Sequence, residues 1–378
     1  MNQLHSKAGL TINNPASGSK QQIRFSNKKE EKGFYLTLRQ RVNAYFKDNK
    51  LSKHANSQML IKTIFILTVF VGTYVMLISN LFSPGVLLLI ALVHGFFTAL
   101  IGLNIAHDAV HGSYTNNPRL NKLIGVCFNI IGANDYMWKI NHNSIHHSYT
   151  NIPDHDGDIE QIPLIRLHPE QDRWWIHRFQ YIYIFFFYSL TSFFWVLLRD
   201  YVEFFHPKIK EYRTDQPAKE FGRMVLYKCI YYVFFLVIPL MVIELPWYYI
   251  LLGFLAMHMI EGLTLALIFQ LAHVIEGTNY PMPDESGKME RSWAAHQMFT
   301  TANFGCSNNF LNYICGGLNF QIEHHLFPNI CHVHYKALAP IVKQTAQEYN
   351  LPYIEHPTYF GALNSHIRVL KRLGTQDT

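Results

Sequence analysis

Residues 81–111 read LFSPGVLLLIALVHGFFTALIGLNIAHDAVH, an apolar run that leads directly into two histidines. The part from Leu81 to Ile105 contains no Lys, Arg, Asp or Glu. About 20 apolar residues in a helix are enough to cross the hydrocarbon core of a bilayer, so this stretch predicts a membrane-spanning helix. His107 and His111 follow on the same helix, and residues four positions apart share a helix face. The sequence therefore predicts two neighbouring imidazoles where a spanning helix leaves the membrane.

Three further stretches have the length and composition of spanning helices. They are Met59–Ser79, the charge-free core Cys229–Ile243, and Leu245–Ile275, in which Glu261 is the only acidic or basic residue apart from histidine. The chain of 378 residues is 49% hydrophobic and only 15% charged, which is apolar for a soluble protein. We expect an all-α integral membrane protein with four transmembrane helices, interfacial helices and a cytosolic helical cap that holds a metal site.

Two other apolar stretches are not counted as spans. Residues 120–133 are too short, and the stretch 181–198 has Arg173 and Arg178 before it and Arg199 after it. Positive charge on both flanks favours a helix that lies in the membrane interface, or one that dips in and returns. Residues 181–198 are nonetheless long enough to cross the membrane, and a complete crossing would give a different topology.

Histidine recurs in three tight clusters. They read His107-Asp-Ala-Val-His111, His142-Asn-Ser-Ile-His146-His147 and Gln321-Ile-Glu-His324-His325. Neutral imidazole is the commonest metal ligand among side chains. On helices, each cluster would present at least two ring nitrogens in one direction. Three such faces are enough to enclose two metal ions.

The order of spans and clusters predicts that all three clusters face the same side of the membrane. Two spans separate the second cluster from the third, and an even number of crossings returns the chain to the side it left. At about 1.5 Å per residue, Leu245–Ile275 would reach about 46 Å, which exceeds the roughly 30 Å hydrocarbon core. Its end should therefore project from the membrane and bring His273 toward the other histidines.

The three clusters resemble the HxxxH, HxxxHH and QxxHH boxes of the membrane-bound fatty acid desaturases. The similarity runs from about Leu60 to about Pro340, and three boxes in order with membrane segments between them are a specific signal. The glutamine of the third box resembles the front-end acyl desaturases, and some bacterial acyl-CoA desaturases share it. The sequence Gln270-Leu-Ala-His273 resembles the additional ligand of the same family.

The resemblance implies an oxygen-dependent fatty acyl desaturase with two iron ions, O2 as co-substrate and external electrons. Removing hydrogen from an unactivated acyl chain needs an oxidant stronger than side chains, such as oxygen activated on iron. Gln321 stands where many relatives have a histidine, and it is open whether it binds iron, holds a water molecule or shapes the substrate channel. The implied metal ligands are His107, His111, His142, His146, His147, His273, Gln321, His324 and His325.

Four carboxylates near the boxes are candidates to orient metal-bound imidazoles. Such imidazoles usually donate their other N–H to a carboxylate or carbonyl. The candidates are Asp108, Asp156, Asp158 and Glu323. An ordinary acidic turn explains any one of them equally well.

Other ionisable residues lie inside a predicted span or near the boxes. Glu261 lies inside a predicted span, where it is a candidate for the acyl tunnel, a partner of His258 three positions earlier, or a protonated buried side chain. Four further histidines near the boxes lack the ligand spacing and are not expected to bind metal: His155, His296, His332 and His334.

Positive charge is concentrated at the start of the chain. Residues 1–58 contain eleven Lys and Arg against three acids, a net +8, while the whole chain is +6. We expect residues 1–58 to form a basic cytosolic tail, disordered over 1–32, with an amphipathic or solvated helix over 34–55. The membrane desaturase domain should cover 59–345 and a cytosolic tail 346–378. By the positive-inside rule, the site and both termini face the cytoplasm, and no nucleic acid is expected as a partner.

The electron donor is expected to be a separate protein. Front-end desaturases often carry a fused cytochrome b5-type domain with an HPGG haem motif, and HPGG is absent from this sequence. A ferredoxin, a flavoprotein or a free cytochrome b5-type protein would serve. The substrate would be an acyl-CoA or an acyl-lipid held next to membrane lipid.

Two other functions fit the same histidines. A membrane di-iron fatty acid hydroxylase would use the same site and differ in its product. A histidine-rich metal transporter is less consistent with the sequence, because transporter sites lie near the bilayer midplane, whereas these clusters lie at helix ends and in loops.

Overall fold

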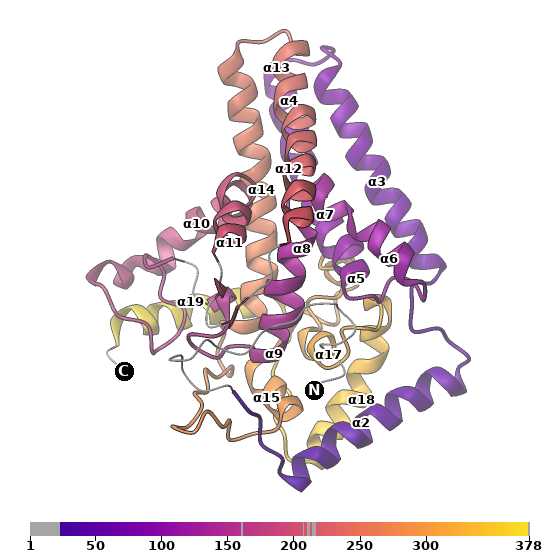
Figure 1. Cartoon of the computed structure of the whole chain (residues 1–378), viewed down its shortest axis with the longest axis vertical. Coiled ribbons are helices and arrows are strands. Elements are labelled where there is room, and N and C mark those ends of the chain that lie inside the picture. The colour runs from indigo at the N-terminus through magenta and orange to yellow at the C-terminus, as the bar shows by residue number, and fades with distance from the viewer. Residues whose placement is uncertain (1–22, 160–161, 207, 210–211, 214–216, 377–378) are drawn as a thin grey trace.

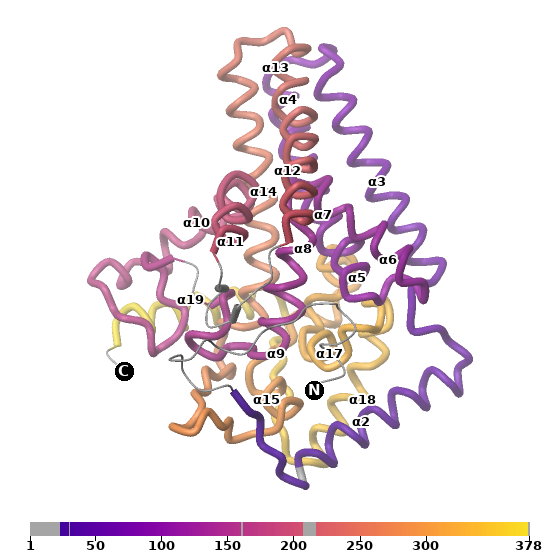
Figure 2. The backbone as a smooth tube through the Cα atoms, in the orientation of Figure 1, coloured from indigo at the N-terminus to yellow at the C-terminus, as the bar shows by residue number. Residues whose placement is uncertain are grey.

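The computed structural model describes residues 23–159, 162–206, 208–209, 212–213 and 217–376. Figure 1 shows long helices projecting at one end of the molecule and shorter helices gathered at the other end. The backbone trace in Figure 2 shows that the first and last parts of the described chain both lie among the shorter helices. We call the group α15 (Trp293–Thr300), α16 (Asn309–Ile314), α17 (Gln321–Leu326) and α18 (Tyr335–Glu348) the cap.

Five helical stretches are long and apolar enough to cross a membrane. They are Ser57–Ile78, Pro84–Val110, Trp175–Phe205, Ala218–Val242 and Trp247–His273. Four of them coincide with the predicted spans. The fifth, Trp175–Phe205, contains the stretch for which the sequence favoured an interfacial position.

These stretches comprise several shorter elements. Along the chain they are α3 (Ser57–Ile78), α4 (Pro84–Leu100), η1 (Ile101–Ala106), α5 (His107–Val110), η4 (Trp175–Phe179), α10 (Gln180–Phe194), η5 (Trp195–Arg199), α11 (Asp200–Phe205), α12 (Ala218–Tyr232), η6 (Val233–Val237), α13 (Ile238–Val242) and α14 (Trp247–His273). Within this set η1, η5 and η6 are π-helical and η4 is a 3₁₀ helix.

The remaining elements are short, except for the longer helices α2, α18 and α19. They are α2 (Lys29–Asp48), α6 (Pro118–Gly125), α7 (Cys127–Ile130), α8 (Asp135–Trp138), η2 (Lys139–His146), α9 (His147–Tyr149), η3 (Gly157–Ile159), α15 (Trp293–Thr300), α16 (Asn309–Ile314), α17 (Gln321–Leu326), η7 (His332–His334), α18 (Tyr335–Glu348) and α19 (Tyr359–Thr375). The described strands are β1 (Lys208–Ile209) antiparallel to β2 (Tyr212–Arg213), and β3 (Asn303–Phe304) parallel to β4 (Glu355–His356).

Glycine allows α14 to pack closely on two neighbouring helices. A Cβ on Gly95 of α4 would lie 2.1 Å from the Met257 carbonyl oxygen, and one on Gly262 would lie 2.6 Å from the Ser189 carbonyl oxygen of α10. Without side chains at these points, the backbones can approach closely, as small residues permit at helix contacts in membranes. Figure 1 shows α10 running obliquely outward from α14.

Polar side chains inside the long helices have partners there. Nδ1 of His94 on α4 forms a hydrogen bond of 2.8 Å with the hydroxyl of Thr73 on α3. Lys228 on α12 is buried and lies 2.7 Å from the Asp200 carboxylate. An ionisable group in an apolar environment is costly unless it is paired, so these contacts help to determine how the helices are arranged.

The helix at the start of the chain packs on the cap. On α2, Phe34, Leu38, Val42 and Phe46 are buried in one apolar cluster with side chains of α15, α17 and α18. The amphipathic pattern predicted over 34–55 therefore forms a helix whose apolar face covers the cap.

Residues preceding α2 are also ordered, where the sequence predicted disorder over 1–32. The Arg24 N–H donates to the Gly287 carbonyl at 2.9 Å, and the Met289 N–H donates to the Arg24 carbonyl at 2.8 Å. Ile23 is buried beside Ile152 and Met289. Residues 1–22, the rest of the predicted disordered segment, lie outside the described residues.

The carboxyl-terminal end of the described chain also packs on the rest of the protein. Its last helix, α19, buries Val369, Leu370 and Leu373 in a cluster that includes side chains of α10 and α14. The predicted carboxyl-terminal tail 346–378 thus contains a strand and a helix that pack on the rest of the protein.

The close contact between α4 and α14 predicts the effect of a small substitution. Gly95→Ala should lower stability by about 1–3 kcal/mol, because the added methyl group overlaps the Met257 carbonyl and the helices must separate. Gly253→Ala is the matched control on α14, since its added methyl group meets no atom within 4 Å. Thermal unfolding in detergent measures both, and an equal Tm for Gly95→Ala and Gly253→Ala would contradict the prediction.

Candidate metal centre

The three histidine clusters meet where the long helices join the cap. His107 and His111 continue the second long helix through α5, and the second cluster lies in η2 and α9. His273 is the last residue of α14, and the third cluster lies in α17. Two π-helical segments, η1 and η2, immediately precede or contain these ligand candidates. Such segments are rare and occur often at functional sites.

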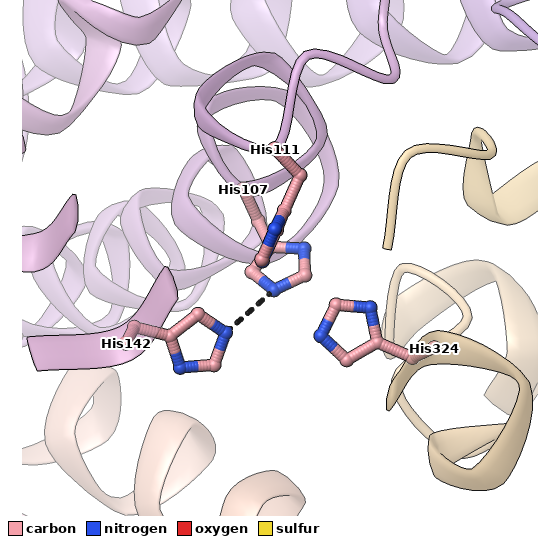
Figure 3. A group of neighbouring side chains, drawn as sticks. All are labelled: His107, His111, His142 and His324. Carbon is pink, nitrogen blue, oxygen red and sulfur yellow. Dashed lines mark hydrogen bonds between the residues drawn. The ribbon is translucent and has the colours of Figure 1, made fainter. Parts of the chain in front are cut away.

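One group of imidazoles comes from three separate segments. It comprises His107, His111, His142 and His324, whose ring nitrogens lie within 4.8 Å of one another (Figure 3). Nε2 of His107 lies 3.2 Å from Nε2 of His142. Two nitrogens bound to one ion at about 2.0–2.1 Å each would be separated by about 3 Å, so this spacing suits a shared metal ion.

A second group lies beside the first. It comprises His146, His273 and His325, again with ring nitrogens within 4.8 Å of one another. The Gln321 side-chain amide lies 3.0 Å from Nε2 of His273 and 3.4 Å from Nε2 of His325. The oxygen and nitrogen of an amide are assigned from their surroundings, so a turn of this group would direct the oxygen toward the same histidines. Gln321 therefore lies among the imidazoles of the second group.

His147 lies between the two groups. Its Nε2 is 3.2 Å from Nε2 of His142, and its ring centroid is 4.4 Å from that of His325. With His147 included, all nine residues predicted as ligands come together in one place. Whether each one binds metal stays a prediction.

The division between groups differs from the one expected for α-helical faces. His142 belongs to the first group and His146 to the second, and the adjacent His324 and His325 are divided in the same way. Each of these clusters therefore contributes to both groups. Among the described histidines, His107 and His111 are the pair used on one helical face, and Gln321 and His325 form a similar pair in the second group.

Burial keeps most of these imidazoles neutral. It is the main reason that the pKa values of His142, His147, His324 and His325 lie well below the usual range, and neighbouring histidines lower them further. His146 is the exception: burial opposes its charge, but Asp156 and Asp158 raise its pKa to about 9. Neutral imidazoles carry the lone pair that a metal ion needs.

Hydrogen bonds on the far ring nitrogens orient four of the imidazoles. Nδ1 of His146 lies 3.0 Å from the Asp156 carboxylate, and Nδ1 of His325 lies 2.8 Å from the Gln297 side-chain oxygen. The Nδ1 atoms of His273 and His324 lie 3.3 Å from the Thr300 carbonyl and the Tyr335 hydroxyl. Metal-binding histidines commonly have such a partner, which leaves Nε2 directed at the ion.

The four predicted carboxylates have different surroundings. Asp156 contacts His146 directly, and Asp158 lies 3.4 Å from the same Nδ1. Asp108 is 3.9 Å from His107 Nδ1 but only 2.8 Å from His332 Nδ1, which makes His332 its closer partner.

Glu323 is directed away from the imidazoles. It accepts hydrogen bonds from Asn303 at 2.7 Å and Tyr353 at 2.9 Å, and burial raises its pKa to about 7. It connects α17 to β3 and to the segment before β4. The predicted contact between this carboxylate and a histidine of the centre is absent from the described hydrogen bonds.

Several contacts could not be recognised in the sequence. Gln297, Thr150 and Tyr335 hydrogen-bond to histidines of the third cluster, but they lie in three segments that carry no ligand spacing. Of the histidines not expected to bind metal, His296 contacts the Thr150 carbonyl and His334 the His54 carbonyl. His332 is engaged by Asp108 and Lys62.

The residues of the centre fit one or two first-row metal ions. Nε2 atoms of His111, His146 and His324 are buried without a hydrogen-bond partner. A buried polar atom without a partner is costly, and a metal ion would satisfy all three. Imidazole suits iron, copper, zinc and nickel, so the ligands alone do not select among these metals.

An apolar cavity adjoins the first group. It is lined mainly by apolar side chains and reaches the ring of His107. Its other lining residues are Gly102, Leu103, Phe128, Ile131, Ala133, Trp138, Ser192, Trp195, Val196, Glu261, Leu265 and Phe269. Glu261 thus lines the cavity, and its carboxylate lies 3.3 Å from Nδ1 of His258, the partner predicted for it.

A second cavity lies beside the apolar one. Both are lined by Trp138 and Trp195, and the second also reaches His142, Asp158 and Arg199. The apolar space near the metal centre is therefore next to a more polar space with charged side chains.

Comparison with known proteins agrees with this geometry. Residues 83–357 match the family model for fatty acid desaturases. The chain is 37% identical to an sn-1 linoleoyl-lipid 6-desaturase of Synechocystis sp., over 94% of this chain and 98% of that protein. It is 36% identical to an acyl-lipid (8-3)-desaturase of Physcomitrium patens, over 91% of this chain and 72% of that protein. It is 35% identical to an sn-1 linoleoyl-lipid 6-desaturase of Arthrospira platensis, over 90% and 92%.

The two groups predict separable losses of metal. His111→Ala should remove the ion of the first group and His273→Ala the ion of the second, so each should lower metal content from about two ions per chain to about one. His356→Ala, outside the centre, is the control. Elemental analysis of the purified proteins measures this. Full metal content in both variants would contradict the assignment.

Proposed function

This chain belongs to the fatty acid desaturase family, and we propose that it desaturates the acyl chain of a membrane lipid, using two iron ions held by its eight clustered histidines. The observation that carries the proposal is the convergence of three boxes and His273 around one buried centre beside an apolar cavity. The desaturases it resembles are oxidoreductases. The two relatives named sn-1 linoleoyl-lipid 6-desaturase act on a lipid-linked chain.

The same relatives support a front-end position for the new double bond. Position 6 lies on the carboxyl side of the double bonds that linoleate already has, and Gln321 opens the third box as in front-end desaturases. We therefore propose a substrate that is already unsaturated. The lipid-linked form is preferred to an acyl-CoA on the names of these relatives.

The overall reaction removes one hydrogen from each of two adjacent carbons. An acyl –CH2–CH2– unit, O2, two electrons and two protons give –CH=CH– and two molecules of water. Iron supplies the activation of oxygen when it is bound. The histidines would hold it through neutral imidazole nitrogens, and the partners of their Nδ1 atoms would fix the ring orientations.

The apolar cavity is the proposed site of the acyl chain. Its aliphatic and aromatic walls suit a hydrocarbon, and His107 brings the metal centre to one wall. Glu261 and Ser192 are polar residues of its lining. The adjoining cavity at Arg199 and Asp158 would then accept the more polar part of the lipid.

We propose four complete membrane crossings, although five stretches are long enough. His146 precedes three of these stretches and His325 follows them, yet both lie in the second group. Only an even number of crossings returns the chain to the same side. The oblique α10 is therefore the stretch that would lie in the interface or return (Figure 1).

The basic residues support a cytoplasmic location for the centre. Residues 1–58 carry a net charge of +8, and α2 within this segment packs on the cap beside the third box. Positive charge is retained on the cytoplasmic side of membranes. We propose that the centre and both termini face the cytoplasm and that a separate electron carrier reaches them there.

A hydroxylase would use the same residues, but the relatives are named desaturases. A transporter site would be expected near the middle of the membrane, whereas the centre here lies where long helices end.

Expression in a host that lacks polyunsaturated lipids should produce a new unsaturated fatty acid. His146→Ala should not, because it removes an imidazole from the second group. Gas chromatography with localisation of the double bond identifies the product. A hydroxylated fatty acid in place of an alkene would refute desaturation.

The cavity predicts a change in chain-length preference. Leu265→Trp should fill part of the cavity and shift the products toward shorter acyl chains, because Leu265 lines its wall. Leu252→Trp on the same helix is the control, since Leu252 is 57% exposed. Competition between acyl chains of different length measures the preference. If both variants keep the preference of the unsubstituted protein, the acyl chain lies elsewhere.

A further inference from the structure

The segment that contains α2 carries a concentration of positive charge. Residues 23–55 contain nine Lys and Arg and three acids, a net +6, which equals the net charge of the whole chain. On one helical face, Lys32 and Arg39 flank Leu36, whose exposed fraction is 58%. An exposed apolar residue within a charged rim is typical of a protein interface.

The acids near this face are already engaged. Glu348 accepts two hydrogen bonds from Arg41, at 2.7 and 3.0 Å, and Glu31 accepts one from the Ser292 N–H. Within the part of the chain that the structure describes, Lys32, Arg39 and Lys47 form no ion pair. Their charge is therefore available to an acidic partner.

Two aromatic side chains connect this face to the histidine centre. The Tyr35 ring packs edge-to-face on Trp293, with centroids 5.7 Å apart, and the Trp293 indole N–H donates to the His147 carbonyl at 3.0 Å. The Tyr35 hydroxyl donates to the Leu326 carbonyl, next to His325, at 3.4 Å. Arg39 lies over the Tyr35 ring, 5.8 Å from its centroid. Tyr35, on one turn of α2, thus contacts the backbone next to the third box directly and reaches the backbone of the second box through Trp293.

We propose that this face, formed by Lys32, Leu36, Arg39 and the edge of Tyr35, is the docking surface for a small acidic one-electron carrier protein. The inference rests on the proposed function, which requires two electrons per turnover. At each encounter the carrier would be oxidised by one electron, which iron held by the histidine centre would accept. Tyr35 and Trp293 provide a short packed path and are not themselves oxidised.

An anionic membrane surface is the alternative partner for basic residues. The amino-terminal half of α2, which includes Lys32 and Leu36 and is followed directly by Arg39, lies at the end of the molecule away from the turns that join the long helices (Figure 1). The carboxyl-terminal half is the one nearer to α3. This placement favours a soluble protein as the partner of the amino-terminal half.

Binding can be measured without bound metal and without turnover. The full-length, metal-free protein in detergent is titrated with an acidic plant-type ferredoxin at several salt concentrations. The double variant K32E/R39E should weaken binding about tenfold at low salt, because charge on an interface rim mainly steers association. The control R119E/K122E reverses two exposed charges on α6 and should leave binding within about twofold.

A second variant tests the path separately from the surface. Trp293→Phe keeps an aromatic ring beside Tyr35 but removes the hydrogen bond to His147. It should leave ferredoxin affinity and metal content unchanged and slow the oxidation of reduced ferredoxin several-fold. An unchanged rate would overturn the role of Trp293.

The remaining outcomes separate this inference from the proposed function. Equal loss of ferredoxin binding in K32E/R39E and R119E/K122E would overturn a defined docking surface, as would unaltered binding in both. Reduced binding of K32E/R39E to phosphatidylserine vesicles, with ferredoxin binding intact, would assign the face to lipid. In each of these cases new fatty acids in the expression host would still support desaturation, whereas their absence would refute it whatever binds α2.

Discussion

Eight clustered imidazoles, seven of them buried, need partners, and the rest of the structure depends on this constraint. Burial lowers the pKa of four of them well below the usual range and keeps them neutral, whereas Asp156 and Asp158 raise the pKa of His146. Six of the ring nitrogens are buried without a hydrogen-bond partner, among them Nε2 of His111, His146 and His324. A metal ion resolves this cost, and the surrounding segments supply hydrogen bonds to the opposite ring nitrogens. The four segments that carry the histidines are therefore held together by the need of their imidazoles for a metal ion and for hydrogen-bond partners.

The long helices determine where this centre can form. α4 and α14 approach so closely that a methyl group at Gly95 has no space. The helical stretch that begins with α4 continues through η1 to His107, and α14 ends at His273. Residues of η1 and α14 line an apolar cavity that reaches His107. The geometry thus combines a polar, metal-binding site with a space suited to hydrocarbon, which is the combination that oxidation of an acyl chain needs.

The cap closes the centre from the other side. Helix α2 buries four large apolar residues against the cap while it keeps a basic face outward. Tyr35 and Trp293 lie between that face and the second box. A single helix near the start of the chain therefore contributes to the stability of the cap and to the proposed exchange of electrons.

The sequence by itself determined the four predicted spans and the seven histidines of the boxes, because long apolar runs and histidine spacing are local patterns. The amphipathic α2 was readable for the same reason. The resemblance to the desaturase family added His273 and Gln321 as candidate ligands. Only the tertiary structure decided that His142 and His146 belong to different groups, since π-helical backbone and the position of α17 set that division. It also decided that Glu323 faces Asn303 and Tyr353, and that Gln297 supports His325, because these contacts join segments distant in the chain. Local periodicity shows which face a side chain shares with its neighbours along the helix, but packing between distant segments decides what it meets there.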